Sequence, residues 1–229
     1  MDKVTMAVGQ GEVVGLIGPS GCGKSTLARL LLRLIEPTSG HVIFEGCDLI
    51  KLDGPRMRKL RRRMQIIFQD PALDPRMPMI KQVIEPLRIH FPDESYAHHR
   101  EVAEDLLNEV GLRPAHMVSY PHELSLGQCQ RASVARALSL SPDFVVADEP
   151  VSALDPVTAV QVIDLLQRLQ QQRRMAVLLI SHDIRLARRM SRRILVMGAG
   201  RIVDEGPTEV VFEKHTNQRS HSVFHHASF

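Results

Sequence analysis

The sequence predicts an α/β fold with a mainly parallel β-sheet, and three observations lead to this prediction. Short apolar runs typical of buried strands alternate with segments of helical periodicity. A glycine-rich segment lies directly between the first apolar run and the first helical segment. The chain has 229 residues, 44% of them hydrophobic, which is enough for one sizeable core. These observations favour a single α/β domain, with or without an inserted lobe.

The glycine-rich segment fits the phosphate-loop pattern G-x-x-x-x-G-K-[ST] and reads Gly18-Pro19-Ser20-Gly21-Cys22-Gly23-Lys24-Ser25-Thr26. The apolar run 13–17 precedes it, and it is followed at helical spacing by Leu27, Leu30, Leu31 and Leu34. Glycines let main-chain N–H groups turn towards an anion, and the positive end of the following helix faces the same point. We expect Lys24 to reach the β- and γ-phosphates of a nucleotide and the Ser25 hydroxyl to bind Mg²⁺.

Further apolar runs predict strands at 41–45, 64–68, 144–149 and 176–180, and a hairpin at 194–203 around the turn Gly198-Ala199-Gly200. Helices are expected at 53–63, near 102–110, at about 126–140 and after the cap Asp155-Pro156. The last of these helices has an apolar face formed by Val162, Leu165, Leu166 and Leu169. Prolines are frequent from 71 to 92, so the alternation of apolar strands and helical segments is interrupted there. We therefore predict that residues 71–141 form a mainly helical lobe inserted into an α/β body of residues 1–70 and 142–229.

The overall composition limits the classes of function. A net charge of +3 is too mild to indicate nucleic-acid binding, and the basic run at 56–63 has no interleaved aromatic residues, so it predicts a solvated helix face. The three cysteines are far apart and odd in number, which predicts no disulfide framework and fits a reducing cytoplasm. No apolar run reaches about 18 residues and no signal peptide is recognisable. Any work at a membrane is therefore expected to depend on a partner.

Polar side chains at the ends of predicted strands form a second group of candidates. Asp148 is expected to be the second anchor for Mg²⁺. Glu149 is expected to point the other way, because side chains alternate along a strand, and to orient or deprotonate the attacking water. His182 and Gln69 also follow apolar strands, and they would contact the γ-phosphate, the water or the metal. Taken alone, a histidine or glutamine at a strand end is more often structural.

A further candidate anion site is the start of the helix that opens with Leu124-Ser125-Leu126-Gly127-Gln128. Ser125 is expected to cap this helix, and Gly127 to leave its main-chain amide approachable. One nucleotide cannot easily use both helix ends when they lie in different lobes. Two copies of the chain facing head to tail could each offer Ser125 to the phosphate loop of the other. Nucleotide would then hold the pair together, and hydrolysis would release it.

Together these motifs resemble the nucleotide-binding subunit of an ABC transporter over nearly the whole chain. In this resemblance 18–26 is the Walker A loop, Gln69 the Q-loop glutamine, 124–128 the signature motif, 144–148 Walker B, 152–155 the D-loop and His182 the switch histidine. The resemblance implies a RecA-like P-loop NTPase core with an inserted helical signature subdomain. It implies ATP and Mg²⁺ as cofactors, with catalytic roles for Lys24, Gln69, Glu149 and His182. The implied contacts are residues 18–26, Gln69, Ser125, Gly127, Gln128 and Asp148 for the nucleotide, and Ser25, Gln69 and Asp148 for the metal.

Four short segments (67–71, 74–76, 120–124 and 148–155) resemble the subgroup that imports dipeptides, oligopeptides, nickel or opine-type metal chelates. This resemblance implies a second ATPase subunit, identical or not, and two membrane permeases supplied by a substrate-binding protein. It places the chain peripherally on the cytoplasmic face of the cell membrane, with the lobe after Gln69 against the permeases and with no nucleic-acid partner. A soluble ABC-type ATPase acting on nucleic acid or ribosomes remains the alternative, although such proteins usually carry additional modules.

Three features depart from the family pattern. Leu126 replaces the usual glycine of the signature motif, so we expect a weakened contact between the two chains. The first aromatic residue, Phe44, follows the phosphate loop, so the chain is expected to begin late and to lack about 1–3 kcal/mol of stacking on adenine. A further option is an ABC-type ATPase domain that is not productive, because the chain begins late. The tail also contains four histidines that could form a metal sensor: His215, His221, His225 and His226. This option is disfavoured, because no cysteine or carboxylate lies near these histidines at the spacing of metal ligands.

Overall fold

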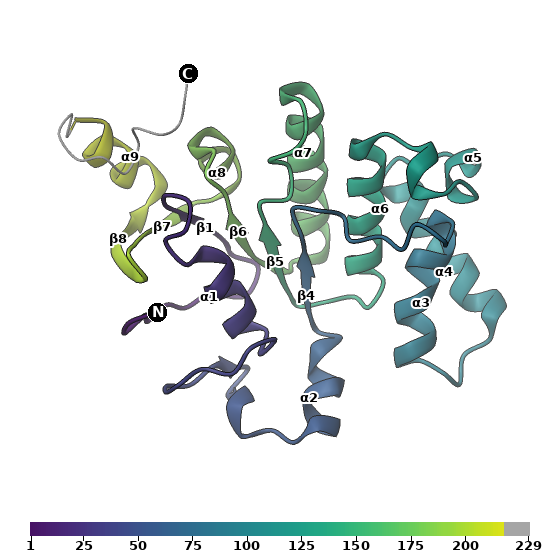
Figure 1. Ribbon diagram of the computed structural model, residues 1–229, viewed down its shortest axis with the longest axis horizontal. Coiled ribbons are helices and arrows are strands. Elements are labelled where there is room, and N and C mark those ends of the chain that lie inside the picture. The colour runs from purple at the N-terminus through teal and green to yellow at the C-terminus, as the bar shows by residue number, and fades with distance from the viewer. Residues whose placement is uncertain (218–229) are drawn as a thin grey trace.

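A six-stranded sheet forms the centre of the computed structural model, which describes residues 1–217 (Figure 1). The strands lie in the order β4-β5-β6-β1-β7-β8, and every neighbouring pair is parallel except the β7–β8 hairpin. The mainly parallel sheet and the hairpin are therefore confirmed. The strands are β1 (Val13–Ile17), β4 (Met64–Ile67), β5 (Phe144–Asp148), β6 (Ala176–Ile180), β7 (Arg193–Gly198) and β8 (Arg201–Pro207).

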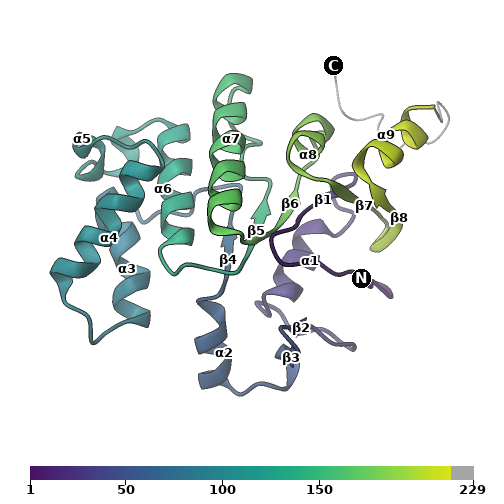
Figure 2. The ribbon, with the colours of Figure 1, turned by 180° about the vertical axis from the view of Figure 1, so that it is seen from behind.

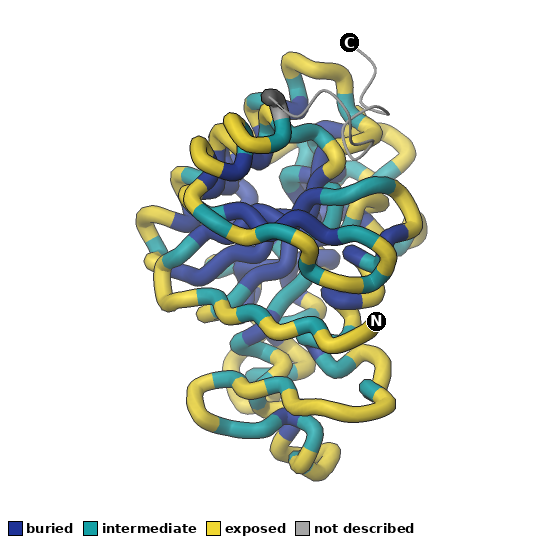
Figure 3. The backbone as a smooth tube through the Cα atoms, turned by 90° about the vertical axis from the view of Figure 1, so that its left-hand side faces the viewer, coloured by how far each residue is buried: buried dark blue, intermediate teal, exposed yellow. Residues whose placement is uncertain are grey.

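Helices cover both faces of the sheet, as the two opposite views show (Figures 1 and 2). Helix α1 (Lys24–Leu31) packs on one face through Leu27 and Ala28. The other face is covered by α7 (Pro156–Arg173), α8 (Ile184–Met190) and α9 (Thr208–Asn217). The strands between these layers are almost wholly buried (Figure 3), which explains why they form continuous apolar runs in the sequence.

Helix α7 begins and packs as the sequence predicts. The Asp155 carboxylate accepts hydrogen bonds from the main-chain N–H groups of Val157 (3.1 Å) and Thr158 (3.0 Å), and Pro156 occupies the first helical position. The four predicted apolar residues of this helix are all buried. The cap fixes where α7 starts, directly after the segment that follows β5.

A group of helices lies beyond the edge strand β4 (Figure 1). It comprises α3 (Met79–His90), α4 (Tyr96–Glu109), α5 (Pro114–Met117) and α6 (Leu126–Leu138), with a short 3-10 turn at Pro121–Glu123. Helix α3 was not expected, because Pro86 lies in its interior and proline disfavours such positions by about 3 kcal/mol. Buried Val83, Ile84 and Leu87 nevertheless hold this helix in the core. That the lobe has its boundaries at 71 and 141 stays a prediction.

Two local predictions near the phosphate loop were wrong. The predicted strand 41–45 is only β2 (Ile43–Phe44), which pairs with β3 (Cys47–Asp48) around a turn with positive φ at Glu45 and Gly46. A 3-10 turn, Leu49–Lys51, follows this hairpin. Leu34 was expected to continue the helical spacing, but it lies outside the first helix, because α1 ends at Leu31, and it is 47% exposed.

Three further findings concern the expectations drawn from composition. The basic helix is α2 (Gly54–Arg61), capped by Asp53, and most of its residues are exposed. All three cysteines are free thiols. Within residues 1–217, no helix combines the length and the apolar character needed to cross a membrane.

Candidate nucleotide site

The phosphate loop lies at the carboxyl end of β1, between this strand and α1. A Cβ atom at Gly18 would collide with the Met197 carbonyl oxygen of β7, so the loop can approach the sheet only with glycine there. Gly21 and Gly23 have positive φ values of 78° and 111°, and no side chain caps α1 at Gly23. The first N–H groups of α1 are therefore available to an anion.

Lys24 lies inside this loop and is only 5% exposed. Its Nζ donates hydrogen bonds to the carbonyl oxygens of Gly18 (2.8 Å) and Pro19 (3.1 Å). Within residues 1–217, no carboxylate forms a salt bridge with this ammonium. A buried charge with neutral partners is unfavourable, so the site has the electrostatic character of an anion-binding site.

The other loop residues divide into surface and core positions. Ser20 and Thr26 are exposed, so ligand can reach them. Cys22 is 7% exposed and packs in the core beneath α1, while its carbonyl oxygen accepts a hydrogen bond from Gly200 N (2.9 Å). Cys22 therefore ties the loop to the β7–β8 turn.

Ser25 and Asp148 meet beside the loop. The Ser25 hydroxyl donates to Asp148 Oδ1 at 3.2 Å, joining the start of α1 to the end of β5. Burial raises the pKa of the Asp148 carboxyl, and the nearby Glu149 charge raises it further, against the hydrogen bond from Ser25. A hard divalent cation would offset this unfavourable burial, and hydroxyl and carboxylate oxygens are the ligands that Mg²⁺ prefers. The two residues therefore fit a magnesium site.

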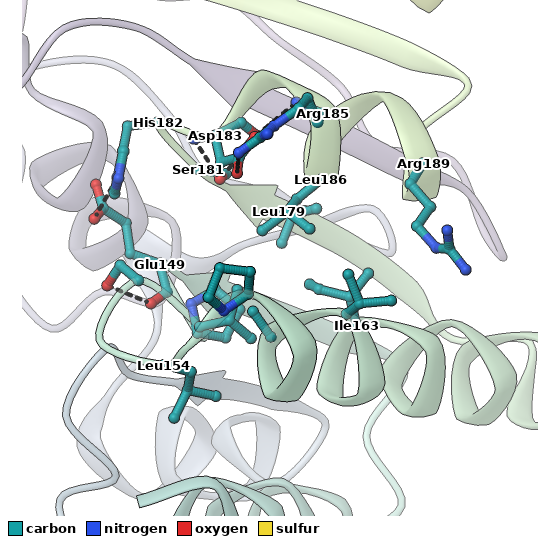
Figure 4. Close-up of a pocket in the computed structure, with 16 residues that line it drawn as sticks. Glu149, Leu154, Ile163, Leu179, Ser181, His182, Asp183, Arg185, Leu186 and Arg189 are labelled. Atoms are coloured by element: carbon teal, nitrogen blue, oxygen red, sulfur yellow. Dashed lines mark hydrogen bonds and ion pairs between the residues drawn. The ribbon is translucent and has the colours of Figure 1, made fainter. Parts of the chain in front are cut away.

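The expectation that side-chain alternation along a strand orients Glu149 is wrong. The strand β5 ends at Asp148, so the alternation of side chains along a strand does not orient Glu149. Instead Glu149 adopts a left-handed conformation (φ 50°), and its N–H donates to the Ile180 carbonyl at 3.0 Å. This turn brings Glu149 Oε2 to 3.0 Å from Nδ1 of His182, which follows β6 (Figure 4). Two predicted catalytic residues are thus brought together.

A pocket of about 380 Å³ lies beside this pair, between α7 and α8 (Figure 4). Its apolar wall includes Ile163, Leu179 and Leu186. The segment that carries His182 is held by Asp183, whose N–H donates to Ser181 Oγ (2.9 Å) and whose carboxylate caps α8. This supporting role of Asp183 was not predicted from the sequence, although an aspartate directly before a helical segment is a recognisable cap.

Gln69 lies at the same level of the sheet edge as Glu149, but no hydrogen bond among the described residues fixes its side chain. Ile67 of β4 pairs with Ala147 of β5, so Gln69 and Glu149 each lie two residues beyond a paired position. Gln69 is exposed, and within residues 1–217 its amide forms no hydrogen bond. Its contact with metal or water stays a prediction.

The start of α6 carries Ser125 in a reciprocal cap. Ser125 Oγ accepts a hydrogen bond from Gln128 N (3.3 Å), and Gln128 Oε1 accepts one from Ser125 N (2.9 Å). Leu126 is 43% exposed beside this cap. Gly127, however, is buried, and a Cβ added there would lie 2.5 Å from Thr158 Cγ2. Close packing of α6 on α7, rather than an approachable amide, explains this glycine.

We expect Gly127→Ala to destabilise the protein by about 1–3 kcal/mol, because the new methyl group overlaps Thr158. Thr158→Ser removes the overlapping methyl group and keeps the hydroxyl, so it should restore most of the lost stability in the double variant. Chemical denaturation of the two single variants and the double variant measures both effects. If Thr158→Ser gives no rescue, the clash is not the reason for glycine at this position.

The helix end at Ser125 and the phosphate loop do not meet within one chain. In both face views α6 and α1 lie on opposite sides of the β4–β5 edge (Figures 1 and 2). No hydrogen bond of the described residues joins 124–128 to 18–26. The two candidate anion sites are therefore separate in a single copy of the chain.

Of the four tail histidines, only His215 lies within the described residues. His215 lies 2.8 Å from Asp204, and His221, His225 and His226 lie outside the described residues. In the part of the chain that the structure describes, no three His, Cys, Asp or Glu side chains form a group suited to a metal. The alternative of a metal sensor therefore gains no support from residues 1–217.

A parallel sheet whose central strand leads through a glycine loop into a helix is the RecA-like P-loop NTPase fold. Among known families, the sequence model described as "ABC transporter" matches residues 1–152. The chain belongs to the ABC transporter family.

Curated relatives are 45–46% identical to this chain over the residues that align. A probable peptide ABC transporter ATP-binding protein of Sinorhizobium fredii is 45% identical over 216 residues, which are 93% of this chain and 61% of that protein. A putative oligopeptide transport ATP-binding protein of Bacillus subtilis is 45% identical over 206 residues, covering 89% of this chain and 63% of that protein. A glutathione import ATP-binding protein of Salmonella paratyphi A is 46% identical over 93% of this chain and 34% of its own length. The chain thus spans less than two thirds of these relatives.

Solved structures agree with the fold. The ATP-binding cassette MJ0796, in a dimeric post-hydrolysis state bound to ADP and Pi, superposes with a TM-score of 0.82 at 32% identity, covering 90% of this chain and 89% of that one. The protein cbiO1 of Clostridium perfringens, part of the ABC transporter complex cbiONQ, also gives 0.82, at 26% identity over 94% of this chain and 85% of its own.

Proposed function

We propose that the protein is the ATP-hydrolysing subunit of an ABC importer for peptides. The observation that carries the proposal is the meeting of Glu149 with His182 (3.0 Å) and of Ser25 with Asp148 (3.2 Å) around one phosphate loop. A buried lysine, a cation site and an acid–histidine pair are the parts that hydrolysis of a nucleoside triphosphate needs. The relatives named above, which are peptide, oligopeptide and glutathione import proteins, support this function.

In the proposed reaction the phosphate loop binds and orients the nucleotide. Lys24 exchanges the carbonyl oxygens of Gly18 and Pro19 for phosphate oxygens, which form stronger, charge-assisted hydrogen bonds. The N–H groups at the start of α1 bind the same phosphates. Ser20 and Thr26 lie at the exposed surface of this loop and complete the contact.

Ser25 and Asp148 would hold Mg²⁺, with Gln69 as a third ligand, directly or through water. Bound there, the ion would neutralise charge on the phosphates during transfer. The exposed amide of Gln69 has no other partner among residues 1–217, so it can move to this position. A cation held there would also offset the like-charge repulsion between Asp148 and Glu149.

Glu149 is the proposed general base. Its Oε2 is held by His182, and both groups lie beside an open pocket from which water can reach them. His182 is 52% exposed, so it can turn from the carboxylate towards the γ-phosphate. The pair thus positions the attacking water and stabilises developing charge.

Two such subunits would complete each site between them. Ser125 and the phosphate loop are separate within one chain, which favours a head-to-tail dimer in which Ser125 and Gln128 of one copy face the nucleotide of the other. Exposed Leu126 would weaken this contact relative to glycine. The partner ATPase can be a second copy or a similar subunit.

The subunit would act at the cytoplasmic face of the cell membrane through two permeases that a substrate-binding protein supplies. Among the substrates expected from the sequence, the names of the relatives favour peptides. Nickel and opine-type metal chelates remain the other members of the proposed substrate class.

Purified chain should release phosphate from ATP only when Mg²⁺ is present, and should copurify from membranes with two hydrophobic permeases. Phosphate release and protein identification measure these two outcomes. Copurification with nucleic acid or ribosomes in place of permeases would favour the alternative of a soluble ATPase. Absence of ATP binding by titration would contradict both functions.

A further inference from the structure

The segment that carries Gln69, residues 68–77, is anchored to the helices beyond β4. Its first anchor is on α6, where Gln130 is buried and its Nε2 donates to the Phe68 carbonyl at 3.0 Å. Arg136, also on α6, donates from Nη1 to the Ala72 carbonyl (2.7 Å) and from Nη2 to the Pro71 carbonyl (2.9 Å). Gln69 therefore lies between residues that α6 binds on both sides.

The second anchor is on α3. Gln82 is 1% exposed, and its Oε1 accepts a hydrogen bond from Asp74 N (3.2 Å). Its Nε2 donates to the carbonyls of Asp74 (2.6 Å) and Met77 (3.0 Å). Within residues 1–217, every side-chain hydrogen bond that 68–77 receives from outside the segment comes from α3 or α6. None comes from the strands of the sheet, at whose edge Asp148 and Glu149 lie.

The contact of Arg136 is unusual for an arginine. The Arg136 side chain is half-buried, and within residues 1–217 no carboxylate lies within salt-bridge distance of it. Burial lowers the pKa of this guanidinium, partly offset by the charge of Glu85. Its planar fork instead binds two successive main-chain carbonyls, a geometry that lysine cannot reproduce.

The two carbonyls come from a turn that needs support. Ala72 has a φ of 50°, in the left-handed region that residues with a Cβ rarely adopt. The Asp70 carboxylate accepts a hydrogen bond from Ala72 N at 3.2 Å, which closes the turn locally. Such a conformation persists only where surrounding contacts hold it, and Arg136 supplies two of them.

We propose that Arg136 is a positioning residue that couples Gln69 to the helix that starts at Ser125. Because α6 carries both the Ser125 cap and Arg136, a movement of this helix moves the main chain on either side of Gln69. The free amide of Gln69 would then approach or leave Ser25 and Asp148 as Ser125 engages the second chain. The inference rests on the proposed function for the role of Gln69.

The test is a double-mutant cycle on ATP hydrolysis by the purified chain. Arg136→Met keeps an unbranched apolar side chain in place of the arginine stem and removes both hydrogen bonds, while Gln69→Ala removes the amide that Arg136 positions. We expect each single variant to lower kcat about tenfold and the double variant to be no slower than Gln69→Ala alone. The KM for ATP should change little, because the phosphate loop is untouched. A double variant about a hundredfold slower would show independent effects and overturn the proposal.

Arg131 provides the matched control. It lies on the same helix and also donates to a main-chain carbonyl, that of Val110 at 3.0 Å, but no hydrogen bond joins it to residues 68–77. Arg131→Met should therefore combine additively with Gln69→Ala. Equal non-additivity for Arg131→Met would show a general effect of α6 and also overturn the proposal. If Arg136→Met does not fold, Arg136→Lys, with one donor group in place of the fork, takes its place in the cycle.

Amide hydrogen exchange gives a readout that does not depend on activity. Arg136→Met should increase exchange of residues 69–77 by about tenfold or more, and Arg131→Met should leave this segment unchanged. Unchanged exchange in Arg136→Met would show that Arg136 does not hold the segment. If the wild-type chain does not hydrolyse ATP, the proposed function fails, and the exchange experiment still decides whether Arg136 holds the Gln69 segment.

Discussion

Replacing Glu149 by Gln should lower the rate of ATP hydrolysis by about 10²- to 10⁴-fold, the contribution typical of a general base. Glutamine keeps the size of the side chain and can still hydrogen-bond His182, but it cannot accept a proton from water. The left-handed turn at Glu149 and its main-chain bond to Ile180 do not depend on the side chain, so the fold should be unchanged. Phosphate release under saturating ATP and Mg²⁺ measures the effect.

ATP binding by the Glu149→Gln variant should persist, since Lys24, Ser25 and Asp148 are intact. We expect nucleotide to accumulate in a closed dimer, because release depends on hydrolysis. Glu101→Gln, an exposed position on α4, is the control and should hydrolyse at the wild-type rate. Hydrolysis at the normal rate in Glu149→Gln would contradict the assignment of the general base.

Replacing Lys24 by Ala should weaken ATP binding by about 10- to 100-fold, the effect of losing one or two charge-assisted hydrogen bonds to phosphate. Hydrolysis should fall with binding. The ammonium is buried against the carbonyl oxygens of Gly18 and Pro19 without a carboxylate, so its main stabilising partner is expected to be the nucleotide. Isothermal titration with ATP, with and without Mg²⁺, measures the change.

Lys24→Met separates binding from folding. Methionine fills most of the lysine volume and removes the buried charge, so the free energy of unfolding of the nucleotide-free chain should stay the same or rise. Lys59→Ala on the exposed face of α2 controls for loss of a positive charge. Normal ATP affinity in both Lys24 variants would mean that the phosphates bind elsewhere.

Much of the site could be predicted because its residues follow strong local signals. The buried strands β5 and β6 are continuous apolar runs, and residues after such strands gather at one edge of a parallel sheet. Asp148 and His182 were located in this way. Asp155 and Ser125 were recognised as helix caps because their residue types and spacing are specific to helix starts.

The missed features depend on contacts between distant segments. Helix α3 contains Pro86, and only the burial of its apolar face in the lobe outweighs this local penalty. The orientation of Glu149 depends on a main-chain bond to Ile180 of the neighbouring strand. The need for Gly127 comes from Thr158 on another helix. Periodicity and residue type do not reveal such contacts between distant segments.

The proposed function depends most on two chains sharing each nucleotide, with the phosphate loop of one facing Ser125 of the other. Mixing two inactive variants, Lys24→Ala and Ser125→Arg, tests this sharing directly. A mixed dimer would contain one doubly damaged site and one intact site, so equal amounts should recover about a quarter of the wild-type ATPase rate after random pairing. If the mixture stays as inactive as each variant alone, although both fold and form dimers, the nucleotide is not shared between chains and the proposed dimer is wrong.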